Sequence, residues 1–388
     1  MQSKAPAAPL DTNRNNQLDG LRGYAALVVV VFHTILGIDP TQISRILYES
    51  ILKIDDTYGR ATKIVLKLFN GETAVVIFFV LSGAVLFNSL RHNTERFAPM
   101  SVKFLLRRFL RIYPALFACL VACAVVFPPA GIPVSFDRFI LNATLYEITI
   151  NGATWTLNVE FIAAIFLLLA YAGFRLGGEW GLFAISLALV LIFKAAWLKP
   201  YMTYFKQFWV CFALGALIPT RAGIWIARWL PPWGWLVALL IVIIFRSTLQ
   251  HVAAAALVTA LYYGKGGSFG VLLERPLSVF LGRISYSFYL FNVVFLEVIC
   301  HYLRSQPWAV ARPIEVGLAT ALIIILLTIP VAWLSVKVIE EPSIRLGRRL
   351  TFTRADRHTS PALTPLIIHP ERPVTPLPPA PDRSPQAS

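Results

Sequence analysis

Arg22 and His33 are the two residues whose types and spacing most directly indicate chemistry. They stand eleven positions apart in the stretch GLRGYAALVVVVFH, which is otherwise mainly apolar. In an α-helix this separation gives a rise of roughly 16 Å and leaves both side chains on one face. An arginine fork binds phosphate oxygens, and an imidazole takes or gives a proton near neutral pH. The spacing therefore suits an elongated cofactor with a charged head at Arg22 and a reactive end at His33.

Both residues also have a structural interpretation. An arginine at the end of an apolar helix commonly anchors that helix at the membrane surface, with its stem along the apolar region. A buried histidine can be a packing residue with satisfied hydrogen bonds. Ionisable residues inside a membrane span are nevertheless costly and usually face a cavity. This cost favours a functional role for His33.

Arg108 and Arg111 form a second candidate site in the stretch FLLRRFLRIYPAL. Residues three apart share a helix face, so both guanidinium groups are expected to point the same way. They are predicted to bind phosphate groups of a cofactor. Lipid headgroups at the inner membrane boundary are the alternative ligands.

Glu160 lies in the stretch NGATWTLNVEF, about eight residues into an apolar run. Counted along their helices, Glu160 and His33 come to similar depths from the same end. A carboxylate beside an imidazole fixes its tautomer and raises its basicity, as general-base catalysis requires. We therefore predict that Glu160 orients His33. The alternative is a buried glutamate that pairs with an arginine elsewhere.

The elements that must position these residues are membrane-spanning helices. Of the 388 residues, 57% are hydrophobic and 14% charged, and the mean hydropathy is +0.66. Apolar runs long enough to cross the bilayer recur along the chain, and about ten are predicted, since a crossing needs roughly 20 residues. Backbone groups in lipid must bond internally, so these runs are expected to be helices. The sequence predicts an all-α, polytopic integral membrane protein. The predicted spans are 20–38, 73–90, 109–128, 153–174, 180–197, 202–219, 233–247, 250–264, 277–300 and 315–338.

The basic residues indicate the orientation and domain organisation of the chain. The net charge is +15, but Lys and Arg gather in alternate loops between apolar runs. This pattern follows the positive-inside rule and predicts cytoplasmic termini in the inner (plasma) membrane, with lipids as partners and no nucleic acid. We expect a cytoplasmic segment over 1–18, a membrane domain over 19–345, and a proline-rich disordered cytoplasmic tail over 346–388.

Two other features are informative. The four cysteines lie within apolar runs without the paired spacing of a zinc site, so no metal is predicted. The connector 39–70 spaces Ile43, Ile46, Leu47, Ile51 and Leu52 as one face of an amphipathic helix. Such a helix is expected to lie on the outer membrane surface.

Five stretches in order resemble the membrane-bound acyltransferase-3 family. They are LDGLRGYAALVVVVFH, IFFVLSG, LLRRFLRIYPAL, WTLNVEF and FLGRISYSFYLF, followed by a last span ending in VIEEP. The likeness covers about residues 18 to 345. It implies transfer of an acyl group, commonly acetyl from acetyl-CoA, to hydroxyls of cell-surface carbohydrates. The partners would be acyl-CoA and a glycan or lipid-linked saccharide acceptor, and acetyl-CoA is a donor substrate, so no permanently bound cofactor is expected.

The resemblance assigns roles residue by residue. The family's Arg or Lys, ten residues and His match Arg22 and His33, and its arginine pair matches Arg108 and Arg111. Together with the spacing argument, the resemblance predicts that the three arginines bind the phosphates of CoA. It also predicts that His33 is catalytic, as a general base or as a carrier of the acyl group, and that Glu160 orients its ring. The predicted substrate-binding residues are Trp155, from the family's tryptophan-to-glutamate block, and the intramembrane Ser82 and Tyr286.

The chain also departs from the family pattern. Many members read Gly-Val-Asp where Ala74, Val75 and Val76 stand, and many have histidine at Asn292. His33 is thus the one deep imidazole predicted to act. The alternative functions are a secondary transporter or flippase of a lipid-linked glycan, a scaffold component, and an acyltransferase for a small molecule such as an antibiotic. A transporter is expected to carry paired broken helices in its two halves, a pattern not found here.

Overall fold

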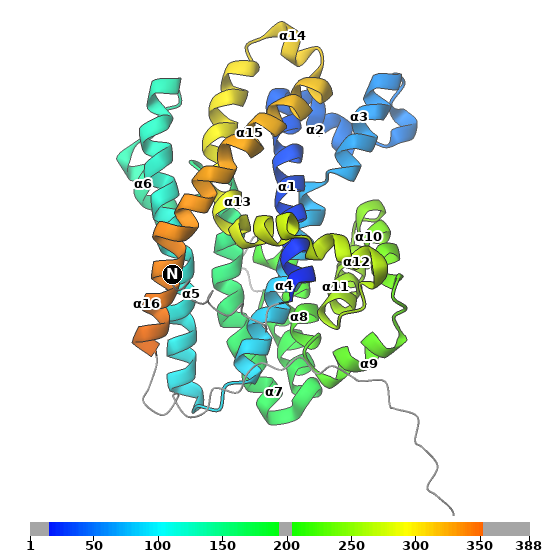
Figure 1. The fold of residues 1–388 in the computed structure, drawn as a ribbon, viewed down its shortest axis with the longest axis vertical. Coiled ribbons are helices and arrows are strands. Elements are labelled where there is room, and N and C mark those ends of the chain that lie inside the picture. The colour runs from blue at the N-terminus through cyan, green and yellow to red at the C-terminus, as the bar shows by residue number, and fades with distance from the viewer. Residues whose placement is uncertain (1–14, 194–203, 352–388) are drawn as a thin grey trace, which may run out of the picture. The chain divides into compact units, whose positions relative to one another are not determined.

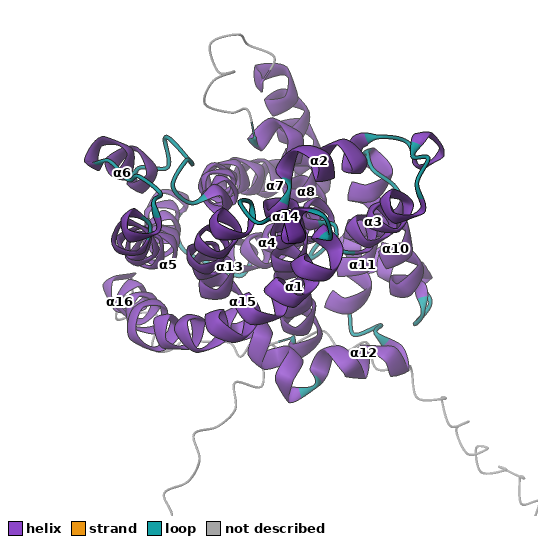
Figure 2. Cartoon of the chain, turned by 90° about the horizontal axis from the view of Figure 1, so that it is seen from above, coloured by secondary structure: helices purple, strands orange, loops and turns teal. Residues whose placement is uncertain are grey.

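The computed structural model describes residues 15–193 and 204–351 (Figure 1). Within these ranges the chain forms helices and no strand (Figure 2). Six helices are long and apolar enough to cross a membrane, or seven if a bent pair counts as one span. The predicted class, an all-α polytopic membrane protein, is therefore confirmed.

The helices fall into two groups by length. The long ones are α1 (Asn16–Ile38), α4 (Gly71–Arg91), α5 (Phe97–Val126), α7 (Trp155–Phe193), α13 (Pro276–Leu303) and α15 (Pro313–Ser335). The shorter ones are α2 (Pro40–Tyr48), α3 (Thr57–Leu68), α6 (Phe136–Ala143), α8 (Phe205–Leu217), α9 (Arg221–Trp229), α10 (Gly234–Ile244), α11 (Thr248–Tyr262), α12 (Gly267–Glu274), α14 (Pro307–Val310) and α16 (Glu341–Thr351). Short turns connect some of them: η1 (Ile51–Lys53), η2 (Pro128–Ala130), η3 (Gly152–Thr154) and the π-helical turn η5 (Val336–Glu340).

The count of long membrane helices is lower than the ten predicted spans. The predicted fourth and fifth spans both lie in α7, and the backbone leaves helical geometry between them, at Gly177 and Gly178. Gly178 has a φ of +58°, a conformation that glycine adopts without strain. A Cβ on Gly173 would lie 2.6 Å from the Gly181 carbonyl oxygen, so the chain folds back closely at this turn. The fifth span continues past residue 193 outside the described residues.

The remaining predicted spans are short or bent. The sixth begins outside the described residues and includes α8, after which α9 turns away by 85°. The seventh and eighth are α10, with 11 residues, and α11, with 15 residues. A crossing needs roughly 20 residues, so neither spans the bilayer alone by length.

Helix α1 packs against α4, α13 and α15 inside the helix bundle (Figure 2). Glycines let α1 and α13 approach closely: a Cβ on Gly282 would lie 1.9 Å from the carbonyl oxygen of Asp19. Small residues at helix crossings are typical of membrane proteins, because packing rather than the hydrophobic effect holds helices together in lipid. This contact fixes the height of α1 relative to α13.

In the connector after α1, three of the five residues of the predicted apolar face are buried on one helix. Ile43, Ile46 and Leu47 are buried on α2 and pack against α1. Ile51 and Leu52 lie in the turn η1 and are 40% and 86% exposed, because the helix ends at Tyr48.

The last described helix corrects the start of the predicted tail. Residues 346–351 belong to α16, which packs against α5. The Nε of Arg107 donates a hydrogen bond of 2.7 Å to the hydroxyl of Thr351. These residues are helical because α5 offers a packing surface and a donor. The predicted tail over 352–388 and most of the segment 1–18 lie outside the described residues.

Candidate active site

Five charged side chains from four elements meet at one end of α1. Arg111 of α5 lies within electrostatic range of Arg22 of α1, its own neighbour Arg108, Glu160 of α7 and Glu340 of η5. The structure thus brings together the three arginines predicted to bind phosphate. We call these five residues the arginine cluster; its members are three arginines and two glutamates.

Arg108 is the most deeply buried arginine of the cluster, with 6% of its surface exposed. One of its terminal nitrogens donates to Glu160 Oε2 over 2.6 Å. Its Nε is also buried, and no acceptor contacts it within the part of the chain that the structure describes. A buried, unsatisfied donor on a charged group costs more than the roughly 1–3 kcal/mol of a neutral one. An anionic ligand would remove this cost.

Arg111 complements Arg108 from the same helix face. It is half-buried, and it makes no hydrogen bond to any described residue. The hydroxyl of Tyr286 on α13 donates to the Ile112 carbonyl oxygen over 2.8 Å and so ties α13 to α5 beside Arg111. Tyr286 was predicted to bind substrate, but its hydroxyl already has this partner and holds the wall of the arginine cluster.

Glu340 is the member of the cluster that the sequence analysis did not single out as a site residue. It is 6% exposed and accepts a hydrogen bond from Ser287 of α13. Arg111 and Arg22 supply the compensating positive charge. The sequence signal was available in the adjacent acidic residues of VIEEP, where the last apolar run ends.

His33 lies on α1 three turns beyond Arg22. The His33 side chain is exposed, although Phe32 and Thr34 on either side of it are buried. The ring makes an edge-to-face contact with Phe32, at 5.2 Å between ring centres. No hydrogen-bond partner contacts the imidazole among the described residues. An exposed imidazole without a partner among the described residues is available to a substrate.

The structure does not contain the predicted contact between Glu160 and His33. Glu160 pairs with Arg108 at the level of the arginine cluster. Its depth follows from the start of α7: the segment before Trp155 is anchored to α13 by Asn151, whose side chain donates to the Leu290 carbonyl oxygen over 3.0 Å. From that anchor, Glu160 extends towards α5 rather than towards His33.

A layer of mostly small side chains separates the arginine cluster from His33. Ala25 and Val29 of α1 are buried against Ala74 of α4 and Tyr289 of α13, with Ala153 beside them. The Tyr289 hydroxyl lies 3.2 Å from both the Thr156 hydroxyl and the Ala153 carbonyl oxygen. Any arm that joins the two sites would pass through this alanine–tyrosine layer.

Trp155 and Ser82 lie away from the charged cluster. The Trp155 ring packs against Phe79 and Phe208, with ring centres 6.0 and 5.4 Å away. Ser82 is half-buried on α4, and its neighbour Gly83 contacts the Phe212 backbone of α8. Trp155 thus packs against α4 and α8, and no described contact links Trp155 or Ser82 to Arg108 or Arg111.

Comparison with known proteins identifies the family to which the chain belongs. The model of the acyltransferase 3 family, described as an acyltransferase domain, matches residues 15–337. No curated protein and no solved structure was found to match the chain. The matched region contains Arg22, His33, Arg108 and Arg111.

Proposed function

Because the chain belongs to the acyltransferase 3 family, we propose that this membrane acyltransferase moves an acyl group from acyl-CoA to a carbohydrate hydroxyl. The preferred group is acetyl and the acceptor is a cell-surface glycan or its lipid-linked precursor. The observation that carries the proposal is the buried Arg108 Nε without an acceptor, in a cluster three helical turns from an unpartnered imidazole.

The arginine cluster binds the phosphates of the donor. CoA carries a diphosphate and a separate phosphate, and Arg22, Arg108 and Arg111 supply forked donors for these oxygens. Glu160 holds the Arg108 guanidinium in place through their 2.6 Å hydrogen bond. The pantetheine arm then extends along α1 through the alanine–tyrosine layer towards His33.

His33 acts on the acceptor hydroxyl. Its ring takes the hydroxyl proton while the oxygen attacks the thioester carbonyl, which forms the C–O bond of the product ester. The C–S bond then breaks, and the departing CoA sulfur receives the proton from His33. In the covalent variant of this scheme, the imidazole first accepts the acyl group and then passes it to the hydroxyl.

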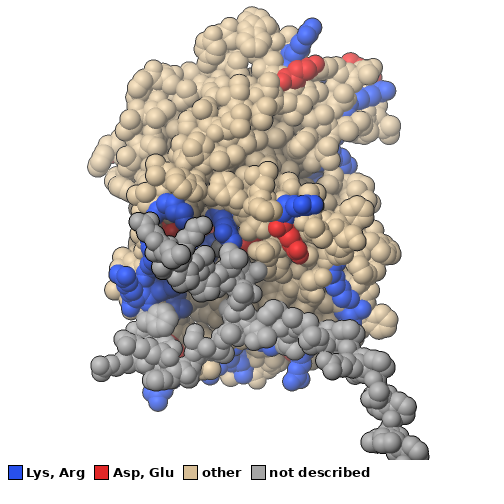
Figure 3. Space-filling model, in the orientation of Figure 1, with Lys and Arg blue, Asp and Glu red and all other residues tan. Residues whose placement is uncertain are grey.

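The distribution of charge supports a cytoplasmic arginine cluster. Lys and Arg gather mainly in the lower half of the face in Figure 3, over α5 and α16, and the upper half is largely uncharged. By the positive-inside rule the basic end faces the cytoplasm, where acyl-CoA is made. We infer that the protein lies in the plasma membrane with cytoplasmic termini and that the His33 end faces outward.

The direct test is CoA release by the purified full-length protein in phospholipid nanodiscs. Labelled acetyl-CoA is supplied with unacetylated glycan extracted from cells that lack the gene. The proposal expects free CoA and labelled glycan in equal amounts. Movement of lipid-linked glycan across the bilayer without CoA release would instead support the flippase alternative. Labelling of a small molecule but not of glycan would reject the carbohydrate acceptor.

A further inference from the structure

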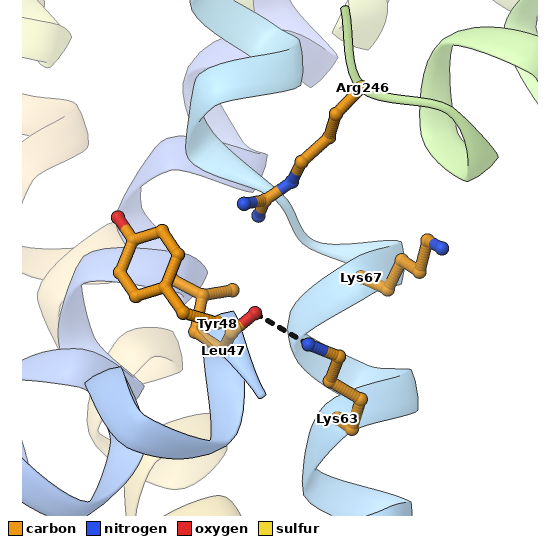
Figure 4. A pocket seen from close by; sticks show the side chains of 5 residues that line it. All are labelled: Leu47, Tyr48, Lys63, Lys67 and Arg246. Carbon is orange, nitrogen blue, oxygen red and sulfur yellow. Dashed lines mark hydrogen bonds between the residues drawn. The ribbon is translucent and has the colours of Figure 1, made fainter. Parts of the chain in front are cut away.

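A cationic pocket lies at the opposite end of α1 from the arginine cluster. It has a volume of about 180 Å³ and is lined by Leu47, Tyr48, Lys63, Lys67 and Arg246. Figure 4 shows that these side chains come from α2, α3 and the connection between α10 and α11. Arg246 is far from α2 and α3 in the sequence, so the pocket exists only in the folded bundle.

Lys63 fixes the shape of the pocket. Its ammonium group donates to the carbonyl oxygens of Ile46, Leu47 and Glu49 at 2.5–3.1 Å. These carbonyls lie at the C-terminal end of α2, where a cation is favoured. Lys63 is therefore a structural cation that also adds positive charge to the pocket.

Lys67 and Arg246 supply further positive charge to the pocket. The Arg246 guanidinium lies 5.7 Å from the centre of the Tyr48 ring, a cation–π contact that positions it at the pocket wall (Figure 4). Neither side chain pairs with a carboxylate in the described part of the chain. Glu49, the carboxylate that acts on Lys63, forms its ion pair with Arg45 at 3.6 Å. Lys63 lies within electrostatic range of both other cations, so the three repel one another unless an anion is present.

The pocket is adjacent to the His33 end of α1. Leu47 packs in one apolar cluster with Phe32, and the Phe32 ring contacts the His33 ring. The donor phosphates, by contrast, are assigned to the arginine cluster at the beginning of α1. An anion in this pocket would therefore belong to the second substrate rather than to the donor.

We propose that this pocket binds an acidic group of the acceptor, a phosphate or a carboxylate. The proposal rests on the function proposed above for the identity of the donor and the role of His33. Lys67 and Arg246 bind the acidic group, and this contact holds the acceptor hydroxyl near the imidazole. The enzyme is thus selective for an anionic glycan or a glycan on a phosphate-linked carrier.

Turnover by the full-length protein in phosphatidylcholine nanodiscs tests the role in acceptor binding. We expect Lys67→Gln with Arg246→Gln to raise the KM for the extracted glycan about ten-fold or more, the scale of one lost charge-assisted contact. The KM for acetyl-CoA should stay unchanged, and Arg246→Lys should recover most of the acceptor affinity. Lys53→Gln, which removes an exposed cation of η1 outside the pocket, is the matched control. An unchanged acceptor KM, or an equal rise for both substrates, would overturn the proposal.

Binding of inorganic pyrophosphate, measured by calorimetry in the same nanodiscs, separates this proposal from the proposed function. Two sites are expected: the double pocket variant should lose one and Arg108→Ala the other. If the double pocket variant still binds pyrophosphate at both sites, the proposed acceptor pocket is wrong. If Arg108→Ala still binds pyrophosphate at both sites, only the proposed donor site is wrong. A lipid headgroup is the competing source of the anion. Native mass spectrometry tests whether phosphatidylglycerol binds the wild type but not the pocket variant. If it does, and if this lipid also displaces pyrophosphate, the pocket binds lipid and the acceptor assignment is wrong.

Discussion

At the scale of single residues, the isolation of His33 is the feature with the clearest catalytic consequence. An imidazole that has no partner among the described residues is free to bond to a substrate hydroxyl. General-base catalysis contributes roughly 10²–10⁴-fold to rate. We expect His33→Gln to lower kcat by this factor, measured by CoA release, while pyrophosphate and CoA still bind. Normal turnover in this variant would remove the catalytic role.

The donor site is tested through Arg108. Arg108→Ala removes a phosphate contact that binds without reacting, so the KM for acetyl-CoA should rise about ten-fold or more with little change in kcat. Arg107→Ala is a control on the same helix, because Arg107 contacts Thr351 instead of the arginine cluster. A fall in kcat at saturating donor, with unchanged KM, would contradict the assignment.

Glu160 distinguishes the predicted partner from the observed one. If the carboxylate acts by holding Arg108, as their 2.6 Å contact indicates, Glu160→Gln raises the KM for acetyl-CoA and leaves the pH dependence of kcat unchanged. If it acted on His33, the same variant would lower kcat and shift its pH profile. Steady-state kinetics across pH with both substrates decide between the two.

At the scale of elements, the sequence predicts features that depend on a single helix, such as which residues share a face. It does not predict how deep a residue of one helix lies relative to a residue of another. Arg22 and His33 share a face of α1 because helical periodicity fixes it, and α1 is a continuous helix as expected. Glu160 was expected beside His33 because its depth was counted along its own helix. The anchoring of Asn151 to α13 sets the true height of α7, and nothing local in the sequence encodes that contact.

The crossing of α1 and α13 predicts a stability effect. An alanine Cβ at Gly282 would lie 1.9 Å from a backbone oxygen that has no freedom to move. Gly282→Ala should therefore force the helices apart and destabilise the fold by about 1–3 kcal/mol, the usual scale of overpacking. Thermal unfolding in nanodiscs measures this loss. Gly177→Ala is the control, since a Cβ there meets nothing within 4 Å, and equal melting temperatures for the two variants would refute the tight crossing.

At the scale of the whole molecule, the two cationic sites are predicted to face opposite sides of the membrane. The four native cysteines are buried, so a cysteine placed on an exposed site can be labelled selectively. In intact cells, an impermeant maleimide should label Lys53→Cys from outside and should label Arg348→Cys only after the membrane is opened. The reverse pattern would invert the topology and move the arginine cluster away from cytoplasmic acyl-CoA.

The count of membrane helices also belongs to this scale. Hydropathy located the apolar segments and the break between the predicted fourth and fifth spans, which falls at Gly177 and Gly178 within α7. It could not show that α10 and α11 stop short of a full crossing and pack on each other. Such features depend on neighbouring helices, which supply the contacts that lipid would otherwise provide.

The alanine–tyrosine layer has a consequence for the cell in which the enzyme works. Val29 and Ala25 are buried against Tyr289 and Ala74 in one cluster. Each donor molecule that enters the membrane from the cytoplasm therefore has to part these side chains before its thioester reaches His33. The thioester arm itself would plug the passage during each catalytic cycle.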